Sequence, residues 1–288
     1  MARSFGRELE GLPTIKQVIL DNDLSARKSL GQHFLLDDNV IARIVNSAAI
    51  DGSMTVLEIG PGPGGLTRAL LASPAKGVVA IERDERSVDA LRDLVHVVGS
   101  RFHLITGDAL ALDLDSLCGQ PFQIVANLPY NIGTKLVLVF LHMLHKPKRM
   151  TLMLQKEVAQ RMIASPGGKD YGRLSIIVQW LAQARVLFDV PARAFKPEPK
   201  VTSSVIELIP RSPPLAEAEP NVLELITQTA FSQRRKMLRV SLKKIHPDVI
   251  VLLEKAGVSP AMRPEELTIQ EFCSIAREFS SWSETTAI

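Results

Sequence analysis

Short apolar runs alternate with amphipathic segments over the first two thirds of the chain. The runs predict five buried strands, at Thr55–Ile59, Gly77–Ile81, Phe102–Thr106, Phe122–Ala126 and Met150–Leu154. Amphipathic segments separate them, including 66–71 and 87–97, and another begins at the cap residues Asp37 and Asp38 and runs to Ala49. Strands separated by helices favour a doubly wound, parallel sheet.

The pattern changes after Leu174. A predicted helix at 174–182 is followed by two β-rich runs, Ala184–Val190 and Val201–Ile209, on either side of a proline-rich loop. The loop has no room for a crossover helix, so the two runs predict an antiparallel hairpin at the sheet edge. The predicted fold is therefore α/β, with a mostly parallel sheet and an antiparallel edge.

A second change in composition predicts two domains. Pro210–Pro220 holds four prolines and is typical of a linker, and residues 222–279 look helical, with breaks at His246-Pro247 and Ser259-Pro260. We expect an N-terminal arm (1–25), a main domain (26–209), the linker (210–220) and a small all-α domain (221–288).

Composition narrows the class of protein. Of the 288 residues 46% are apolar and 23% charged, with a net charge of +3 that alone does not indicate nucleic acid. Cys118 and Cys273 have no zinc spacing and predict inert thiols in a reducing cytoplasm. Residues 1–11 lack the apolar core of a signal peptide, and the apolar run 136–144 is too short to cross a bilayer. We expect a soluble protein.

A glycine-rich turn follows the first predicted strand and opens a helix. Gly60, Gly62 and Gly65 satisfy the dinucleotide-binding pattern, and Glu82, 22 residues after Gly60, ends the second strand. A carboxylate in that place accepts hydrogen bonds from ribose hydroxyls. The alternative is a structural turn with a surface glutamate. The pattern predicts an adenosine cofactor but fits NAD and S-adenosylmethionine alike.

Two further polar groups follow predicted strands. Asp108, in Gly107-Asp108-Ala109, is placed either to accept a bond from the adenine amine of a cofactor or to cap a helix. Asn127-Leu128-Pro129-Tyr130 follows the fourth strand and faces the same crevice.

The Asn-Leu-Pro-Tyr turn suits an aromatic amine. The lone pair of an adenine amino group is delocalised into the ring, and two carbonyls, of the Asn127 side chain and the Leu128 backbone, would favour its tetrahedral form. Pro129 constrains Leu128 to an extended conformation. Tyr130 offers a face on which a base stacks. The alternative is a plain β-turn.

These motifs together resemble those of the ribosomal RNA adenine dimethyltransferases, a class I methyltransferase family with a Rossmann-like sheet. Arg27–Leu35 resembles the family's N-terminal cofactor motif, Phe195–Ser203 its late aromatic motif and Phe231–Arg239 its basic signature. His33 stands where asparagine is also common, and Val240-Ser241 replaces frequent asparagines.

The resemblance implies a role for each matching residue. S-adenosylmethionine would contact Gln32, His33, Leu35, Glu58, Gly60, Gly62, Glu82, Asp108, Ala109 and Asn127. The catalytic residues would be Asn127, Leu128, Pro129, Tyr130 and Phe195, with the target adenine between the rings of Tyr130 and Phe195.

Six basic residues lie within eleven positions that hold no acid: Arg234, Arg235, Lys236, Arg239, Lys243 and Lys244. On a helix, Arg235, Arg239 and Lys243 would share one stripe, above an apolar seam of Leu238, Leu242 and Ile245. We favour contact with RNA phosphates over an ordinary solvated face. His142 and His145 have no third ligand nearby, so no metal site is expected.

The resemblance implies dimethylation of N6 of two adjacent adenosines in the 3′-terminal hairpin loop of 16S rRNA, within the immature 30S particle. The expected enzyme is cytoplasmic and monomeric. Three alternatives stay open: a large-subunit rRNA adenine methyltransferase, a ribosome assembly factor that acts mainly by binding, and a nicotinamide oxidoreductase.

Overall fold

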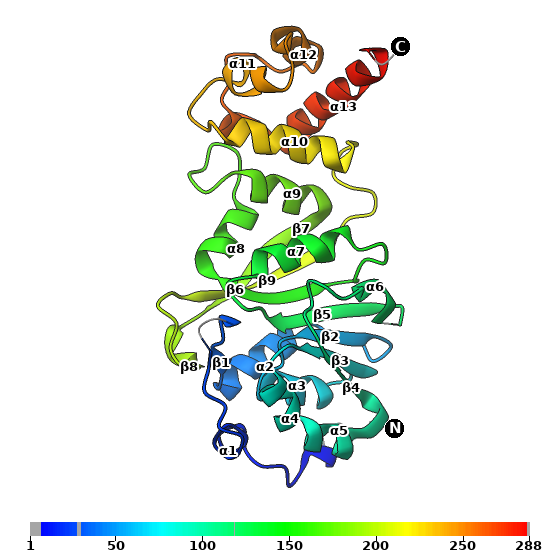
Figure 1. Ribbon diagram of the computed structural model, residues 1–288, viewed down its shortest axis with the longest axis vertical. Helices are drawn as coiled ribbons and strands as arrows, with labels where there is room; N and C mark the ends of the chain where they lie inside the picture. The colour runs from blue at the N-terminus through cyan, green and yellow to red at the C-terminus, as the bar shows by residue number, and fades with distance from the viewer. Residues whose placement is uncertain (1–6, 28–29, 118, 287–288) are drawn as a thin grey trace. The chain divides into compact units, whose positions relative to one another are not determined.

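The computed structural model describes residues 7–27, 30–117 and 119–286, and these form two compact units. The first unit comprises residues 1–159 and 185–210, and the second comprises residues 160–184 and 211–288. Figure 1 shows the first unit in blue to green and most of the second in yellow to red.

The first unit is built on a sheet that has seven strands within the described residues, in the order β4-β3-β2-β5-β6-β9-β7. The pairs from β4 to β6 are parallel, and β9 pairs antiparallel with β6. The strands are β2 (Thr55–Ile59), β3 (Gly77–Glu82), β4 (Phe102–Thr106), β5 (Phe122–Asn127), β6 (Met150–Gln155), β7 (Ala182–Val190) and β9 (Ser203–Pro210). The predicted α/β fold, mostly parallel with an antiparallel edge, is confirmed.

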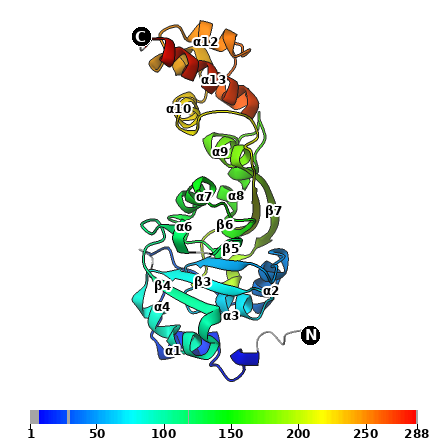
Figure 2. The ribbon, with the colours of Figure 1, turned by 90° about the vertical axis from the view of Figure 1, so that its right-hand side faces the viewer.

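The central strands β2, β3, β5 and β6 are buried over most of their length because helices cover the sheet. Val56, Val78 and Phe102 belong to one core cluster with Ile44 of α2 and Leu70 of α3. Figure 2 shows α2 and α3 beside each other along the sheet. The helices of this region are α2 (Asp38–Ser47), α3 (Gly65–Leu71), α4 (Glu85–Ala90), α5 (Arg92–Val98), η3 (Gly99–Arg101), α6 (Leu114–Leu117), α7 (Gly133–His142) and α8 (Lys156–Ile163). The cap of α2 is confirmed, since the Asp37 carboxylate accepts from the N–H groups of Asn39 and Val40.

The described part of the expected N-terminal arm is folded. It forms η1 (Arg7–Leu9) and α1 (Ile15–Asp21), and its apolar side chains Leu9 and Leu12 pack against the core. Arg101 also pairs with Glu8, at 2.5 Å. The sequence did not indicate these contacts because only a few apolar residues, widely spaced, make them.

A small two-stranded sheet joins distant parts of the first unit. β1 (Phe34–Leu35) pairs antiparallel with β8 (Phe195–Lys196), and Leu36 N–H extends the pairing to Ala194 O at 3.0 Å. The turn before β8 is η4 (Ala192–Ala194). β1 belongs to the N-terminal cofactor motif and β8 to the late aromatic motif, so these two strands of distant motifs lie side by side.

The second unit is helical, as predicted, but it takes in residues 160–184, which the sequence suggested for the main domain. Its elements are α9 (Arg173–Leu181), α10 (Pro220–Phe231), α11 (Leu238–Ser241), η5 (Leu242–Lys244), α12 (Val249–Lys255), η6 (Pro264–Glu266) and α13 (Ile269–Thr286). Phe231 of α10 stacks on Phe272 of α13 with ring centroids 5.9 Å apart and meets Tyr171 edge-on at 6.3 Å. Aromatic packing against Tyr171 draws this segment into the second unit.

The proline-rich stretch after β9 is bonded to the helices of the second unit. Arg211 N–H donates to Leu181 O at 2.7 Å, and the Trp180 indole N–H donates to Ala216 O at 2.7 Å. Arg277 of α13 donates to Glu217 O. Although its composition is typical of a linker, this stretch is therefore ordered by hydrogen bonds to the second unit.

The basic signature does not form one helix, which corrects the predicted stripe. The chain leaves α10 after Phe231 and turns through residues 232–236, so Arg235 lies in a turn, Arg239 in α11 and Lys243 in η5. The N–H groups that begin α11 are taken by carbonyls of another loop, Leu238 to Met262 O at 2.8 Å and Arg239 to Pro260 O at 3.2 Å. The apolar seam is partly right: Leu238 and Leu242 are fully buried, and Ile245 is only half-buried.

We expect Tyr171→Phe to destabilise the protein by about 1–3 kcal/mol, because the buried Tyr171 hydroxyl donates to Leu267 O and its loss leaves that carbonyl unsatisfied. Chemical unfolding of the full chain measures the difference. Ser116→Ala is the control, since that exposed hydroxyl also donates to a backbone carbonyl, of Asp113. Equal stability of wild type and Tyr171→Phe would contradict the assigned bond.

Candidate active site

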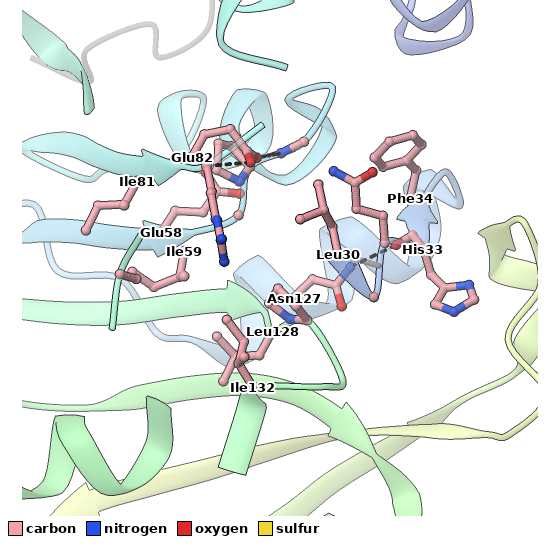
Figure 3. A pocket seen from close by; sticks show the side chains of 18 of the residues that line it. Leu30, His33, Phe34, Glu58, Ile59, Ile81, Glu82, Asn127, Leu128 and Ile132 are labelled. Carbon is pink, nitrogen blue, oxygen red and sulfur yellow. Dashed lines mark hydrogen bonds between the residues drawn. The ribbon is translucent and has the colours of Figure 1, made fainter. Parts of the chain in front are cut away.

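A pocket opens at the carboxyl ends of β2, β3, β4 and β5, within the first unit (Figure 3). Parallel strands present the residues that follow them at one edge of a sheet, so four loops distant in sequence meet there. The predicted site residues that line the pocket are Gln32, His33, Leu35, Glu58, Gly60, Gly62, Glu82, Asp108, Ala109, Asn127, Leu128, Pro129 and Tyr130.

The glycine turn requires residues without a side chain. Gly60, Gly62 and Gly64 have φ of +69°, +55° and +92°, a left-handed conformation that glycine adopts most easily. At Gly62 a Cβ would lie 3.2 Å from the Phe34 ring, and at Gly60 it would lie 3.8 Å from Pro129. The turn therefore brings its backbone close to both neighbouring segments, and a ligand meets main-chain atoms there.

Glu82 is held by the backbone. Its carboxylate accepts from the N–H groups of Gly62 at 3.0 Å, Arg83 at 2.7 Å and Asp84 at 2.8 Å. Burial raises the pKa of Glu82, and the three backbone bonds counteract that rise. An ionised carboxylate has about four acceptor positions. After three backbone bonds, Glu82 keeps acceptor capacity in a fixed direction.

Glu58 lies beneath the same pocket in a different environment. Its side chain is 1% exposed, and its Oε2 has no hydrogen-bond partner within the described residues. Burial, with a smaller contribution from the charge of Glu82, raises the pKa of Glu58 to about 8. Glu58 is therefore mostly a neutral acid at neutral pH, next to a backbone-bonded carboxylate.

Asp108 lies before a turn at 109–111 and not at the start of a helix, since α6 begins only at Leu114; this corrects the helix-cap interpretation. Its Oδ1 accepts from Leu110 N–H at 3.0 Å, and its Oδ2 pairs with Arg83 at 3.1 Å. The side chain is 32% exposed and still lines the pocket. The bond to Leu110 therefore stabilises a turn, and contact with a ligand, the other interpretation of Asp108, stays a prediction.

The Asn-Leu-Pro-Tyr turn closes the pocket on the side of β5. The Asn127 amide donates from Nδ2 to His33 O at 3.3 Å, and Leu128 N–H donates to Met153 O at 3.2 Å (Figure 3). With Nδ2 engaged by the main chain, Oδ1 of Asn127 is the acceptor left for a ligand. The turn thus has a fixed backbone and one defined side-chain acceptor.

Tyr130 presents a ring at the pocket and is covered on one face. His33 stacks on it, with centroids 5.3 Å apart and planes inclined by 29°. The His33 ring is held in turn, since Nδ1 lies 2.8 Å from Pro197 O. Burial raises the pKa of Tyr130, so its hydroxyl stays protonated at neutral pH.

Gln32 shows a role that the motif did not suggest. Its Nε2 donates to Asp84 Oδ2 at 3.0 Å, and its Oε1 accepts from Arg27 N–H at 2.9 Å. Asp84 also binds Arg86, and that hydrogen bond is the main cause of the lowered pKa of Asp84. Asp84 and Arg86 therefore anchor the segment before β1. The sequence did not predict this role, although the aspartate two positions after Glu82 could have indicated it. Lys28 and Ser29 of this motif lie outside the described residues.

Phe195 is not brought into the pocket. It lies in β8 with 3% of its surface exposed and packs in the core cluster opposite Leu35.

The basic residues lie in the second unit, where Arg235, Lys236, Arg239, Lys243 and Lys244 are exposed. Arg234 is half-buried and paired with Glu265 at 2.6 Å. Its charge is therefore already partly neutralised within the protein.

The described residues lack two further features. They contain no group of three or more His, Cys, Asp or Glu side chains placed to hold a metal ion. They also contain no helix long and apolar enough to span a bilayer. Cys273 is buried and unpaired, and Cys118 lies outside the described residues.

We expect the stability of the protein to fall from about pH 4.5 to about pH 8, and we expect Glu58→Gln to reduce this fall, leaving the smaller part that the raised pKa of Glu82 contributes. Folding raises the pKa of Glu58 from 4.5 to about 8, so the folded state holds one more proton than the unfolded state in this window. The free energy of unfolding therefore decreases as the pH rises, by on the order of several kcal/mol. Chemical unfolding at both ends of the window measures it.

The control for this experiment is Asp51→Asn. Asp51 is exposed, and hydrogen bonds from Ser53 lower its pKa, so it is ionised in both states across the window. Its replacement should leave the pH dependence as in wild type. An unchanged pH dependence in Glu58→Gln would show that another group carries the proton.

Known proteins resemble this chain over almost its whole length. It is 46% identical to ribosomal RNA small subunit methyltransferase A of Paracoccus denitrificans, over 93% of this chain and 96% of that protein. It is 48% identical to the protein of the same name from Chelativorans sp., over 94% and 99%.

Solved structures agree with the sequence comparison. A dimethyladenosine transferase from Plasmodium falciparum matches with a TM-score of 0.74 at 26% identity, covering 87% of this chain and 98% of that one. The 23S rRNA methyltransferase ErmE matches with a TM-score of 0.64 at 27% identity, over 86% and 99%. The family model described as ribosomal RNA adenine dimethylase matches residues 23–281. The resemblance predicted from the motifs is confirmed: this chain belongs to the ribosomal RNA adenine dimethylase family.

Proposed function

We propose that this protein transfers methyl groups from S-adenosylmethionine to N6 of two adjacent adenosines in the 3′-terminal hairpin loop of 16S rRNA. The enzyme class and the cofactor follow from the family. Small-subunit rRNA as substrate is supported by the relatives at 46–48% identity, which are named small subunit methyltransferases. The observation that carries the chemistry is that the Asn127–Tyr130 turn and the Glu82 carboxylate line one pocket.

The pocket fits an adenosine cofactor. Glu82, fixed by three backbone bonds, would accept hydrogen bonds from the ribose hydroxyls, and the glycines of the turn would let the ligand approach the main chain. Gln32, His33, Leu35, Glu58, Gly60, Gly62, Asp108, Ala109 and Asn127 would complete its surroundings. When bound, S-adenosylmethionine supplies an electrophilic methyl group on a sulfonium.

The residues of the turn prepare the acceptor nitrogen. The Asn127 Oδ1, directed by the bond from Nδ2 to His33 O, accepts one N–H of the adenine amine, and the Leu128 carbonyl accepts the other. These bonds favour the tetrahedral nitrogen whose lone pair is available. Pro129 keeps Leu128 extended. The amine becomes acidic only after it has gained a methyl, so no strong base is required.

Tyr130 supplies the flat surface on which the target base stacks, worth about 1–3 kcal/mol per base. A loop base is already partly unstacked, so moving it into the pocket costs less than from a duplex. A stacking role for Phe195 stays a prediction. Its ring would have to leave the buried position in β8 to meet a base.

The basic residues of the second unit are proposed to bind RNA phosphates. Five of them are exposed: Arg235, Lys236, Arg239, Lys243 and Lys244. Arg234, although paired with Glu265, keeps an exposed part and belongs to the same cluster. The short elements α11 and η5 carry several of these residues, and the buried leucines Leu238 and Leu242 hold the backbone of both elements in place.

Three finer points belong to the same proposal. The immature 30S particle is the proposed substrate form, because an RNA loop must be accessible for a base to enter the pocket. That the enzyme acts as a monomer stays a prediction. The cytoplasm is proposed as the place of action, since bacteria hold their ribosomal RNA there.

The test is incubation with labelled S-adenosylmethionine and immature small subunits, followed by nucleoside analysis. Dimethyladenosine at two neighbouring positions of 16S rRNA is expected. The similarity to ErmE makes large-subunit RNA the second candidate. A primer-extension block on 23S rRNA, with none on 16S rRNA, would favour that candidate.

We expect Asn127→Ala to lower methyl transfer about a hundredfold, because a group that stabilises developing charge is removed. Binding of S-adenosylhomocysteine should weaken much less. Asn131→Ala, in the same turn, is the control and should keep most of the turnover. Near-normal turnover in Asn127→Ala would remove Asn127 from the mechanism.

Arg235→Gln combined with Arg239→Gln should weaken RNA binding at all sequences and flatten its dependence on salt. Each lost phosphate contact removes about 0.7–0.9 from the logarithmic salt slope. Titrations at several salt concentrations give the slope. The exposed Arg92→Gln, paired with Asp89 in the first unit, should leave it unchanged. An unchanged slope in the double variant would make the cluster an ordinary solvated surface.

A further inference from the structure

We infer that Ser203 is a positioning residue for the target adenine: it fixes the ring of Tyr130 through a hydrogen bond between the two hydroxyl groups. The inference rests on the proposed function and assigns a role within the same site. It also gives the late motif, residues 195–203, a contact with the pocket that its aromatic residue Phe195 does not make.

The contact is direct and short. Tyr130 Oη lies 2.5 Å from Ser203 Oγ, although 73 residues separate the two in sequence. Ser203 is fully buried, and Tyr130 is half-buried with its ring at the pocket. Because Ser203 is fully buried, water competes less for this bond than for a bond between two exposed hydroxyls.

Ser203 is held on a rigid element. It is the first residue of β9 and pairs with Gln155 of β6, and Lys156 N–H donates to Thr202 O at 2.9 Å. Its neighbour Ser204 donates to Asp189 Oδ1 at 2.6 Å, and Asp189 also binds Lys156 at 2.6 Å. These bonds on both sides fix the position of Ser203, and its hydrogen bond in turn fixes the hydroxyl of Tyr130.

Tyr130 needs such a tether. The residue lies in a turn after β5, and a ring in a turn has rotational freedom that must be lost when a base stacks on it. His33 contacts one face of the ring at 5.3 Å between centroids, and this contact does not fix the hydroxyl end. The bond to Ser203 does. It reduces the ordering that base binding would otherwise require.

The inference makes a specific kinetic prediction. Ser203→Ala should lower kcat/KM for methylation of immature small subunits about tenfold, as expected for the loss of one buried hydrogen bond. Tyr130→Phe should cause a similar loss. The double variant should be no worse than either single variant, because both changes remove the same bond. Affinity for S-adenosylhomocysteine should stay within about twofold, since that bond lies on the base side of the pocket.

Ser204→Ala is the matched control. Ser204 is equally buried in the same strand but donates to Asp189 and not to Tyr130. Its effect on kcat/KM should multiply with that of Tyr130→Phe. Ser203→Thr keeps a hydroxyl and should retain more activity than Ser203→Ala. Should Ser203→Ala fail to fold, the loss caused by Tyr130→Phe is compared between Ser203→Thr and wild type, and equal losses are expected.

The possible outcomes are distinct. Multiplicative losses for Ser203→Ala and Tyr130→Phe, or wild-type kcat/KM in Ser203→Ala, would overturn the inference. So would a folded Ser203→Thr in which Tyr130→Phe costs nothing. Failure of the proposed function gives a different result, because the wild-type protein would then form no dimethyladenosine at all.

Discussion

The hydrogen bond from Gly62 N–H to the Glu82 carboxylate is the interaction on which the pocket depends. It joins the turn after β2 to the end of β3, and both groups are removed from water. Glycine is favoured there because the backbone is left-handed and a Cβ would lie only 3.2 Å from the Phe34 ring. With this bond in place, the carboxylate has one direction, and the loops after β4 and β5 are arranged around it.

The alternating pattern was sufficient to predict the sheet, because each of these strands is a short, mainly apolar run bounded by segments of a different pattern. β2 and β4 match their predicted bounds, and β3, β5 and β6 are each one residue longer. The pocket was predictable for the same physical reason. Glu82, Asp108 and Asn127 each lie at or after the end of a parallel strand, and those ends meet at one edge.

What sequence could not show depends on contacts between distant residues. Nothing local to Gln32 indicates a bond to Asp84, and nothing local to Ser203 indicates Tyr130. The helical pattern of the sequence continues past Phe231, but the chain turns there. The carbonyls of Met262 and Pro260 accept the N–H groups that begin α11, in place of carbonyls of a continuous helix. Phe195 is buried because β8 pairs with β1, and strands of only two residues leave no periodicity in the sequence.

The pairing of β1 with β8 also has a consequence for how the protein is made. Phe34 meets Lys196, so the two sides of this small sheet are separated by most of the first unit. Closing so long a loop carries an entropic cost that only late, cooperative contacts repay. During synthesis the sheet strands from β2 to β6 emerge before β8 does. The wall of the pocket that contains His33 therefore lacks its partner strand until β8 has been made, so a nascent chain can complete its binding site only when nearly the whole of this unit has left the ribosome.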